Sequence, residues 1–253
     1  LKSYFENINY SVLIFDRDKK EISPFLWHPR YLPSKASTHR TSATNDWRNF
    51  EDLFSYKESI VFDVGAAVGA TSRIFCKDAK IVYSFEPNLE NFNTLKDIIY
   101  LERITNIKPF NVAVSNQNSV LKFHNRESHG VHSLGKHPKG KVLKTTEIQS
   151  IRLDDFYQNN FHNGETIGLL KIDTEGFEYE VLKGSENLLK IKAIKCILFE
   201  HSKSILNSLG KNPDAIFKLL EEYQYEVYDY TGNSFNYKKD NYSKISDFIA
   251  LVS

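Results

Sequence analysis

Short apolar runs alternate along this chain with longer stretches in which apolar residues recur at helical spacing. The runs are rich in Val, Ile and Phe and fall at residues 60–64, 80–87, 107–115, 166–173 and 193–200. Runs of this kind are typical of buried strands. Amphipathic stretches at 88–102, 178–189 and 213–224 predict helices. Strands that alternate with helices predict a parallel sheet with helices on both faces and right-handed crossovers.

Two intervals depart from this alternation. Residues 115–165 contain β-like pieces at 119–124 and 141–151 before a helical stretch, "RLDDFYQN". About fifty residues in place of a short crossover indicate a β-rich insertion between the third and fourth strands, where substrate contacts are common. The chain closes with two strands, 225–232 and 246–253, which predict an antiparallel edge.

Residues 1–57 have little periodic apolar sequence, apart from a candidate strand at Tyr10–Phe15. The stretch "SPFLWHPRYLPSKASTHRTSATNDW" holds three of the seven prolines. We therefore expect an N-terminal arm or cap rather than an independent domain, and one domain over 58–253. Trp27, Tyr31 and Trp47 either stack on an acceptor or hold the arm against that domain.

Composition narrows the class of protein. A net charge of +1 over 253 residues gives no reason to expect a nucleic-acid partner, and the apolar runs are too short to span a membrane. Cys76 and Cys196 lie in predicted elements without metal or redox spacing, so we expect reduced thiols in a cytoplasmic protein. The chain contains no Met, so Leu1 is not expected to be the native start, and a preceding targeting segment stays open.

The first buried strand runs into a turn of small residues, Gly65-Ala66-Ala67-Val68-Gly69-Ala70, and then into a helix. Small side chains and unpaired N–H groups at a helix start let a ligand approach the backbone closely. The turn lacks the third glycine of a dinucleotide fingerprint and the lysine of a P-loop. Asp63 beside it disfavours a polyphosphate and favours a ligand with a cationic amine or sulfonium.

Acidic residues follow the carboxyl ends of several predicted strands, namely Asp63, Glu86, Asp173 with Glu175, and Glu200. Ligands of open α/β sheets bind at these strand ends. Glu86 ends the second strand, where a carboxylate accepts hydrogen bonds from a ribose diol. A solvated acid and a plain packing turn are the alternatives, but together the turn and Glu86 favour a bound adenosine moiety.

Six segments carry a resemblance to a known family: "DVGAAVGATS", "SFEPNLENFNTL", "NVAVSN", "SIRLDDF", "LLKIDTEGFEYEVLKGSENLL" and "CILFEHS". In this order and spacing the chain resembles the FkbM family of class I S-adenosylmethionine-dependent methyltransferases, from about residue 59 to about 200. Ala67 stands where the family often has Asn, and residues 1–57 are not covered.

The resemblance implies a Rossmann-like, doubly wound, seven-stranded sheet that is mostly parallel with an antiparallel terminal strand. It implies S-adenosylmethionine as cofactor, with Glu86 on the ribose hydroxyls and residues 111–113 near the adenine. The full set of implied cofactor residues is Asp63, Gly65, Ala66, Gly69, Ser72, Glu86, Pro87, Asn111 and Ala113.

Methyl transfer to a hydroxyl benefits from a base that removes its proton. We predict Asp173 or His201 as this base, with Glu175 positioning the acceptor; Glu175 as a helix-start acid and His201 as a bystander are the alternatives. His124, His129, His132 and His137 crowd the insertion, and Asp173, Glu175 and Glu200 could meet a hard cation. Neither group has a ligand spacing typical of a metal site, so we expect none.

The resemblance implies methyl transfer, often to a hydroxyl, and we therefore predict O-methylation of a hydroxyl on a small molecule or glycan. N-methylation is less favoured, because "DTEG" stands where many amino-group methylators carry a proline-rich aromatic motif. A nicotinamide oxidoreductase is disfavoured by its incomplete fingerprint. A binding module that keeps the cofactor pocket without turnover is the alternative from another class. The identity of the acceptor and the oligomeric state are not predicted.

Overall fold

The computed structural model describes residues 14–16, 21–23, 54–126, 141–229, 232–240 and 246–252. The chain divides into two compact units, Leu1–Arg40 and Thr41–Ser253. In the first unit, β1 (Ile14–Asp16) pairs antiparallel with β2 (Glu21–Ser23). The candidate strand at Tyr10–Phe15 overlaps β1 in its last two residues, and the rest of it lies outside the described residues. Other residues named from the sequence also lie outside the described residues: Trp27, Tyr31, Trp47, His129, His132 and His137.

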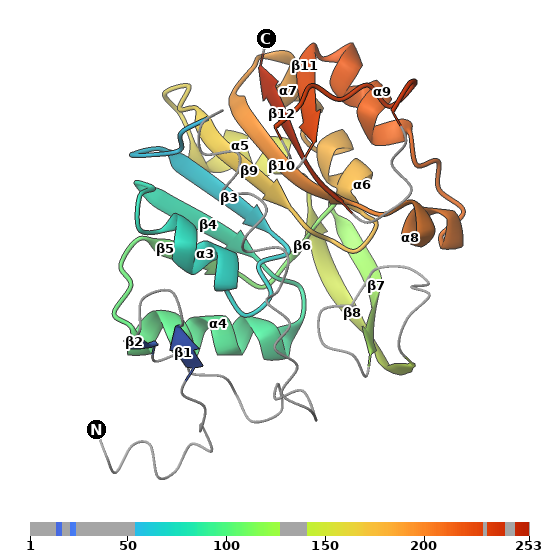
Figure 1. Cartoon of the computed structure of the whole chain (residues 1–253). Helices are drawn as coiled ribbons and strands as arrows, with labels where there is room; N and C mark the ends of the chain where they lie inside the picture. The colour runs from blue at the N-terminus through green and yellow to red at the C-terminus, as the bar shows by residue number, and fades with distance from the viewer. Residues whose placement is uncertain are drawn as a thin grey trace, which may run out of the picture. The chain divides into compact units, whose positions relative to one another are not determined.

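The second unit is built on a seven-stranded sheet in the order β11-β12-β10-β9-β3-β4-β5 (Figure 1). Its strands are β3 (Ile60–Val64), β4 (Ile81–Phe85), β5 (Ile107–Phe110), β9 (Ile167–Ile172), β10 (Ile194–His201), β11 (Tyr225–Asp229) and β12 (Ser246–Val252). Strand β12 pairs antiparallel with both β10 and β11, whereas the pairs from β10 to β5 are all parallel. This confirms the predicted mostly parallel sheet with an antiparallel terminal strand.

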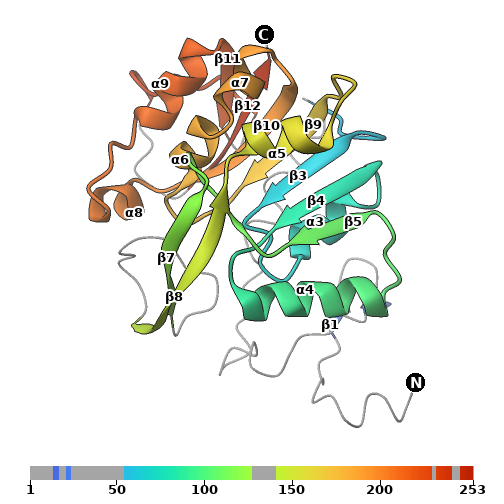
Figure 2. The same ribbon diagram turned by 180° about the vertical axis from the view of Figure 1, so that it is seen from behind.

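Helices cover both faces of this sheet, as Figures 1 and 2 show from opposite sides. Helices α3 (Ala70–Phe75) and α4 (Leu89–Leu101) pack on one face, where Phe75 joins the apolar cluster of Val61 and Val82. On the other face lie α5 (Leu153–Asn160), α6 (Glu178–Lys183), α7 (Glu186–Lys190) and α9 (Ala215–Glu222), which pack against a larger cluster. Because both faces are covered, the parallel strands are apolar without alternation.

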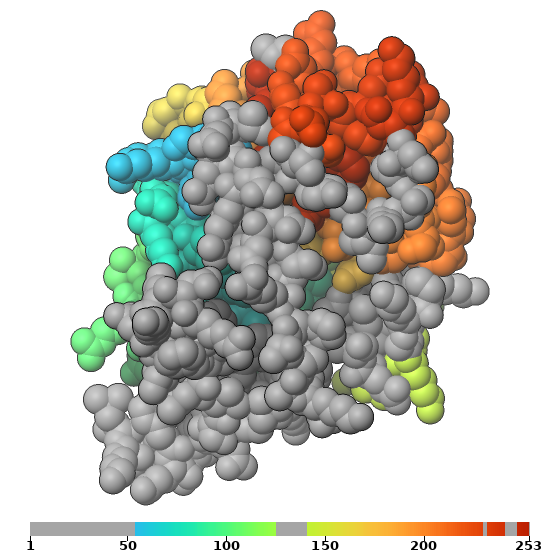
Figure 3. Space-filling view, in the orientation of Figure 1, coloured from blue at the N-terminus to red at the C-terminus, as the bar shows by residue number. Residues whose placement is uncertain are grey.

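Helix α8 (Lys203–Ser208) follows β10 and completes the described helices of this unit. Among the residues that the structure describes, no helix is long and apolar enough to cross a membrane. The two cysteines are free thiols: Cys196 is buried in the sheet and Cys76 is half-buried. Figure 3 shows the described atoms in space-filling view, with the blue and cyan elements around β3 and β4 on one side and the orange elements around α8 and α9 on the other.

Two predicted elements are each divided in the structure. The run at 107–115 forms β5 and then a separate strand, β6 (Ala113–Val114), because the Asn111 amide donates to the Glu86 and Pro87 carbonyls and turns the chain. The predicted helix at 178–189 is divided into α6 and α7 around Gly184. A Cβ at Gly184 would lie 2.0 Å from the Ser115 carbonyl oxygen, so the break lets these backbones meet.

The predicted β-rich insertion forms a second sheet of three strands, in the order β6-β8-β7. Strand β7 (Ser119–Arg126) and strand β8 (Val142–Ile151) form a long antiparallel pair that extends away from the main sheet (Figure 1). Phe123 on β7 is buried, whereas the far part of β8 is exposed. The insertion is therefore anchored at one end, and its buried face looks toward the carboxyl ends of the main strands.

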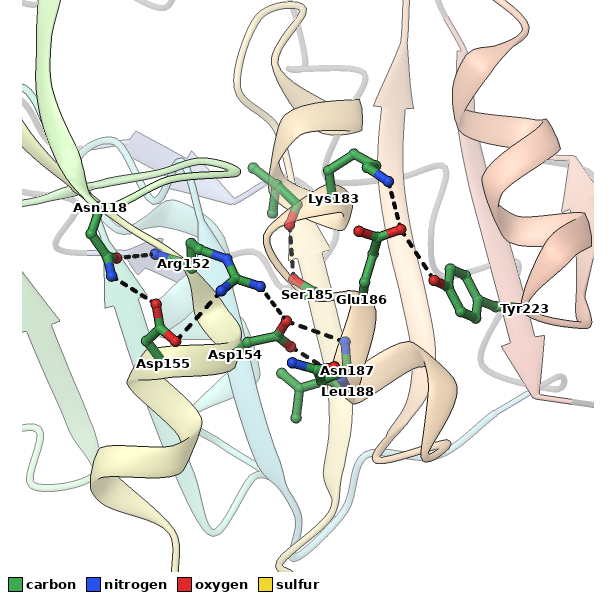
Figure 4. A network of polar contacts seen from close by, with 11 residues as sticks. Asn118, Arg152, Asp154, Asp155, Lys183, Ser185, Glu186, Asn187, Leu188 and Tyr223 are labelled. Carbon is green, nitrogen blue, oxygen red and sulfur yellow. Dashed lines mark hydrogen bonds and ion pairs between the residues drawn. The ribbon is translucent and has the colours of Figure 1, made fainter.

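A polar network holds the base of this insertion against the helices (Figure 4). Asn118, just before β7, accepts the Arg152 N–H at 2.8 Å and donates to the Asp155 carboxylate at 2.7 Å. Asp154 in turn pairs with Arg152 at 2.9 Å and accepts N–H groups at the start of α7, from Asn187 at 3.2 Å and Leu188 at 3.1 Å. The segment "SIRLDDF" thus joins the insertion to α5 and α7.

The turn after β3 comes into close backbone contact with the end of β9. Gly65 has a φ of +78°, and a Cβ there would lie 1.8 Å from the Asp173 carbonyl oxygen. Gly164, on a surface turn, has a similar φ of +70° but no atom within 4 Å of its Cβ position. The two glycines therefore share the left-handed backbone and differ in the space around it.

We expect Gly164→Ala to lower the free energy of unfolding by about 1 kcal/mol, the penalty of an L side chain in the left-handed region. Gly65→Ala is expected to lower it by about 3 kcal/mol or more, because the added methyl also forces β3 and β9 apart. Chemical denaturation of the two variants measures the difference. Equal losses would contradict the close approach.

Candidate functional site

Four polar side chains of the main sheet lie on one of its faces. Asp63 on β3 stands in register with Ser84 on β4 and with Lys171 on β9. Lys171 stands beside Leu198 of β10, so Glu200, two positions on, lies on the same face. Because side chains alternate along a strand, these groups share the α3 and α4 side and meet at the carboxyl ends.

Asp63 is the buried centre of a hydrogen-bond network at this edge. Its Oδ2 accepts the Thr71 hydroxyl at 2.8 Å and the Ser72 hydroxyl at 2.5 Å, and Ser72 also contacts the Ser84 hydroxyl at 2.8 Å. Asp63 and Ser72 have no exposed surface. These contacts join the first turn of α3 to β3 and β4, so both residues support the turn from beneath.

The small-residue turn and Glu86 hold each other directly. One carboxylate oxygen of Glu86 accepts the Ala67 N–H at 2.8 Å, and the other accepts the Asn88 N–H at 2.8 Å. Ala67 has a φ of 47°, the left-handed region that favours Gly or Asn. The N–H of Gly65 meanwhile donates to the Phe85 carbonyl at 3.0 Å. The turn is thus fixed beside the end of β4.

Burial raises the pKa of Glu86 to about 7, and its two N–H donors only partly offset this effect. The residue is only 5% exposed. It is therefore poised between its neutral and ionised forms at neutral pH. A ligand that supplies hydrogen-bond donors, such as a ribose diol, stabilises the ionised form.

Lys171 is a functional candidate that the sequence analysis did not single out. Its ammonium lies 3.2 Å from the Asp63 carboxylate and 3.6 Å from the Asp173 carboxylate, and it donates to the Gly65 carbonyl at 3.1 Å. Burial by itself lowers the pKa of Lys171, but the carboxylates of Asp63 and Asp173 outweigh it and hold the pKa above its ordinary value. A lysine inside the otherwise apolar run "GLLKI" was the signal that could have identified it.

Glu178, the first residue of α6, fixes the conformation of the turn after β9. Its buried carboxylate accepts the N–H of Thr174 at 2.9 Å, the Thr174 hydroxyl at 3.0 Å and the N–H of Gly176 at 3.1 Å. Glu175, between them, has a φ of 55°. Glu178 thus acts as the N-terminal acid of this helix, and Glu175 projects from a constrained turn.

Three carboxylates meet at this end of the site. Asp173, Glu175 and Glu200 each offer an oxygen within 4.8 Å of the others. Burial and the negative charges of Asp173 and Glu175 raise the pKa of Glu200 to about 9. Acidic groups alone do not make a metal site, and the Lys171 ammonium already stands 3.6 Å from Asp173. Acids gathered at one point favour a ligand that carries a positive charge.

The turn, Glu86 and the carboxylates line one cavity of about 170 Å³. Its wall consists of Val64, Gly65, Ala67, Phe85, Glu86, Pro87, Asn91, Val112, Ala113, Val114, Phe123, Asp173, Thr174, Glu175 and Glu200. The cavity has a polar end at Glu86, an acidic end at Asp173 and an apolar wall from 112–114 and the insertion.

Six of the predicted site residues line this cavity: Gly65, Glu86, Pro87, Ala113, Asp173 and Glu175. Asp63, Ala66, Gly69 and Ser72 do not line it. Gly69 precedes α3 with a φ of +89°, and a Cβ there would lie 2.4 Å from the Leu95 side chain. Asn111 does not line the cavity, and its side-chain amide donates to the Glu86 and Pro87 carbonyls.

The structure does not bring His201 into this cavity. It follows Glu200 on β10 and therefore faces the opposite side of the sheet, where it packs on Phe217 with ring centroids 5.0 Å apart. Its Nε2 lies 2.8 Å from the Pro213 carbonyl oxygen, and burial lowers its pKa. It borders a separate cavity of about 240 Å³ beside α6 and α9.

Some lining residues were not among the predicted site residues. Glu200 was noted as an acid at a strand end. Because side chains alternate along a strand, Glu200 and His201 had to face opposite sides of the sheet. Phe123 and Asn91 reach the cavity from the insertion and from α4. No local pattern marks these two residues, because tertiary packing alone brings them to the strand ends.

Comparisons with known proteins agree with this geometry. The profile of the methyltransferase FkbM domain matches residues 63–227. The hexuronic acid methyltransferase AglP of Haloferax volcanii is 28% identical over 169 residues, which cover 66% of this chain and 63% of that protein. The chain thus spans just under two thirds of the length of this relative.

Among solved structures, the methyltransferase FkbM from Methylobacillus flagellatus KT superposes with a TM-score of 0.50 at 16% identity. The match covers 78% of this chain and 44% of that one. At this identity the likeness concerns the fold alone.

We expect Lys171→Met to lower the free energy of unfolding by about 3–5 kcal/mol, because it leaves the buried Asp63 carboxylate without its counter-charge. The double variant Asp63→Asn with Lys171→Met is expected to recover part of this loss. Lys190→Met, at an exposed position of α7, is the matched control and is expected to change stability by about 0.5 kcal/mol at most. Denaturant titration measures all three. No recovery in the double variant would show that the ion pair is not the cause.

Proposed function

This chain belongs to the FkbM methyltransferase family, and we propose that it transfers a methyl group to a hydroxyl of an acidic sugar in a glycan. S-adenosylmethionine is the methyl donor. The observation that carries the proposal is one cavity that is lined by both Glu86 and the three carboxylates Asp173, Glu175 and Glu200. An adenosyl sulfonium has a diol for the first end and a positive charge for the second.

In this proposal the adenosine lies along the apolar wall. The Glu86 carboxylate accepts the ribose hydroxyls, and residues 112–114 pack against the adenine. Gly65 and Ala67 present backbone to the ligand, since neither carries a side chain larger than a methyl group. Asp63 and Ser72 hold the turn from beneath, and Asn111 holds the chain that leads into β6.

Catalysis then depends mainly on alignment. The sulfonium is already a good electrophile, so the protein must place the acceptor oxygen, the methyl carbon and the sulfur in line and exclude water. Asp173 and Glu175 border the acidic end, where the sulfonium and the acceptor would meet. The sequence predicts Asp173 or His201 as the base and Glu175 in positioning the acceptor. In the cavity, Asp173 already lies 3.6 Å from the Lys171 ammonium, so its role as the base stays a prediction of the sequence alone.

The acceptor class is inferred from the relative and from the cavity wall. AglP is a hexuronic acid methyltransferase, and this supports an acidic sugar as the acceptor here. Phe123 reaches the cavity from the insertion, which offers an apolar surface for a sugar ring. N-methylation is the alternative that shares this cofactor, and a binding module without turnover is the alternative that lacks the reaction.

We expect Glu86→Gln to weaken S-adenosylmethionine binding about 10- to 100-fold, because hydrogen bonds to a charged acceptor contribute about 1.5–3 kcal/mol. Isothermal titration calorimetry measures the affinity. Glu90→Gln, an exposed acid in the first turn of α4, is the matched control and is expected to bind like the unaltered protein. Equal affinities for the two variants and the unaltered protein would show that Glu86 does not bind the cofactor.

We expect release of S-adenosylhomocysteine when the protein is given hexuronate-containing glycans, and much less with neutral hexose glycans or with amines. Mass spectrometry of the acceptor is expected to show a gain of one methyl group on oxygen. Methylation of nitrogen would favour the alternative transferase. Cofactor binding without product on any acceptor would favour the binding module.

A further inference from the structure

We propose that Glu200 is the base that takes the proton from the acceptor hydroxyl, and that it ionises when the cationic methyl donor binds. The proposal rests on the proposed function and names the residue that performs its proton transfer.

The geometry of the cavity leads to Glu200. It projects from β10 on the same face as Lys171 and lines the acidic end beside Asp173 and Glu175. It is half-buried, and no residue that the structure describes forms a hydrogen bond with its carboxylate. Its lone pairs are therefore available to a group that enters the cavity.

The other acids of the site have partners already. Lys171 lies 3.6 Å from Asp173, and Glu86 accepts two backbone N–H groups. Glu178 is occupied by the Thr174 and Gly176 groups of its own turn. His201 faces the opposite side of the sheet. Among the residues that the structure describes, none forms a hydrogen bond or ion pair with the Glu200 carboxylate at this end of the cavity.

The charges around Glu200 explain why its ionisation depends on the donor. It faces Asp173 and Glu175 from the turn after β9, Glu178 from α6, Asp247 from β12, and the ammonium of Lys171. Burial and these acids raise its pKa to about 9, so it is mostly neutral in the empty site at pH 7. A sulfonium nearby reverses the balance, because a positive charge favours the ionised carboxylate.

The proposed step balances without another reactant. The acceptor O–H bond breaks and its proton moves to the Glu200 carboxylate, while the oxygen forms a bond to the methyl carbon. The S–CH₃ bond breaks, and its electron pair stays on sulfur to give neutral S-adenosylhomocysteine. With the cation gone, Glu200 is left neutral, which matches its state in the empty site. It releases the proton when the next donor binds.

The first test measures binding and needs no acceptor. We expect S-adenosylmethionine to bind Glu200→Gln and the unaltered protein alike at pH 6. At pH 9 it is expected to bind the variant about 10- to 100-fold more weakly, since only the ionised Glu200 attracts the cation. Both proteins bind the same ligand at each pH, so titration of the ligand itself does not affect the ratio of their affinities. With neutral S-adenosylhomocysteine the ratio is expected to stay near one throughout.

A second variant tests the electrostatic cause. Asp247→Asn removes one acid opposite Glu200 on the neighbouring strand, which lowers the pKa of Glu200. We expect the rise in S-adenosylmethionine affinity with pH to move to lower pH in this variant. Glu222→Gln, exposed at the end of α9, is the control and is expected to leave the pH profile unchanged.

The activity test uses the glycan with which the unaltered protein releases the most S-adenosylhomocysteine. We expect Glu200→Gln to reduce kcat about 10²–10⁴-fold, the usual contribution of a positioned base, with the KM for the acceptor little changed. Asp173→Asn is expected to act mainly through affinity for the donor. A larger kcat loss in Asp173→Asn than in Glu200→Gln would overturn the assignment, as would activity lost to a chelator and restored by Mg²⁺.

The outcomes also separate this inference from the proposed function. If neither S-adenosylmethionine nor S-adenosylhomocysteine binds at any pH, the proposed function fails. If both bind but the affinity ratio does not change with pH, the role of Glu200 fails while the methyltransferase proposal stands. Circular dichroism and thermal melting of each variant confirm that the fold is retained.

Discussion

The buried ammonium of Lys171 is the contact on which the rest of the site depends. It bridges the Asp63 carboxylate, the Asp173 carboxylate and the Gly65 carbonyl, and so joins the ends of β3 and β9. Removing these charges from water is costly, and the cost is tolerated only because each has a partner in reach. The turn that approaches the ligand and the turn that carries the acids are thereby held at a fixed separation.

The distribution of charge along the cavity follows from this bridge. Lys171 offsets part of the negative charge beneath the site, while the acids Asp173, Glu175 and Glu200 gather above it. At the other end, Glu86 is held by backbone N–H groups rather than by a cation. One end therefore suits hydrogen-bond donors and the other suits a positive charge. This asymmetry gives a bound ligand one preferred direction.

The insertion contributes shape rather than charge. The contacts of Asn118, Arg152 and Asp154 fix its base to α5 and α7, and Phe123 then closes the apolar side of the cavity. A long strand pair held only at its base leaves its outer part exposed. The exposed part of the insertion can thus vary in sequence without disturbing the main sheet.

The sequence by itself determined the order of strands and helices, the glycine turn and the acids at the strand ends. Each of these rests on local periodicity or on residues that are close together in the chain. Neighbouring residues of a strand point to opposite faces, so the sequence also implied that Glu200 and His201 lie on different sides of the sheet. Only the tertiary structure decided that Lys171 joins Asp63 and Asp173, that Asp63 and Ser72 lie beneath the cavity, and that Phe123 closes it. These outcomes depend on register and packing between segments far apart in the chain, for which no local pattern exists.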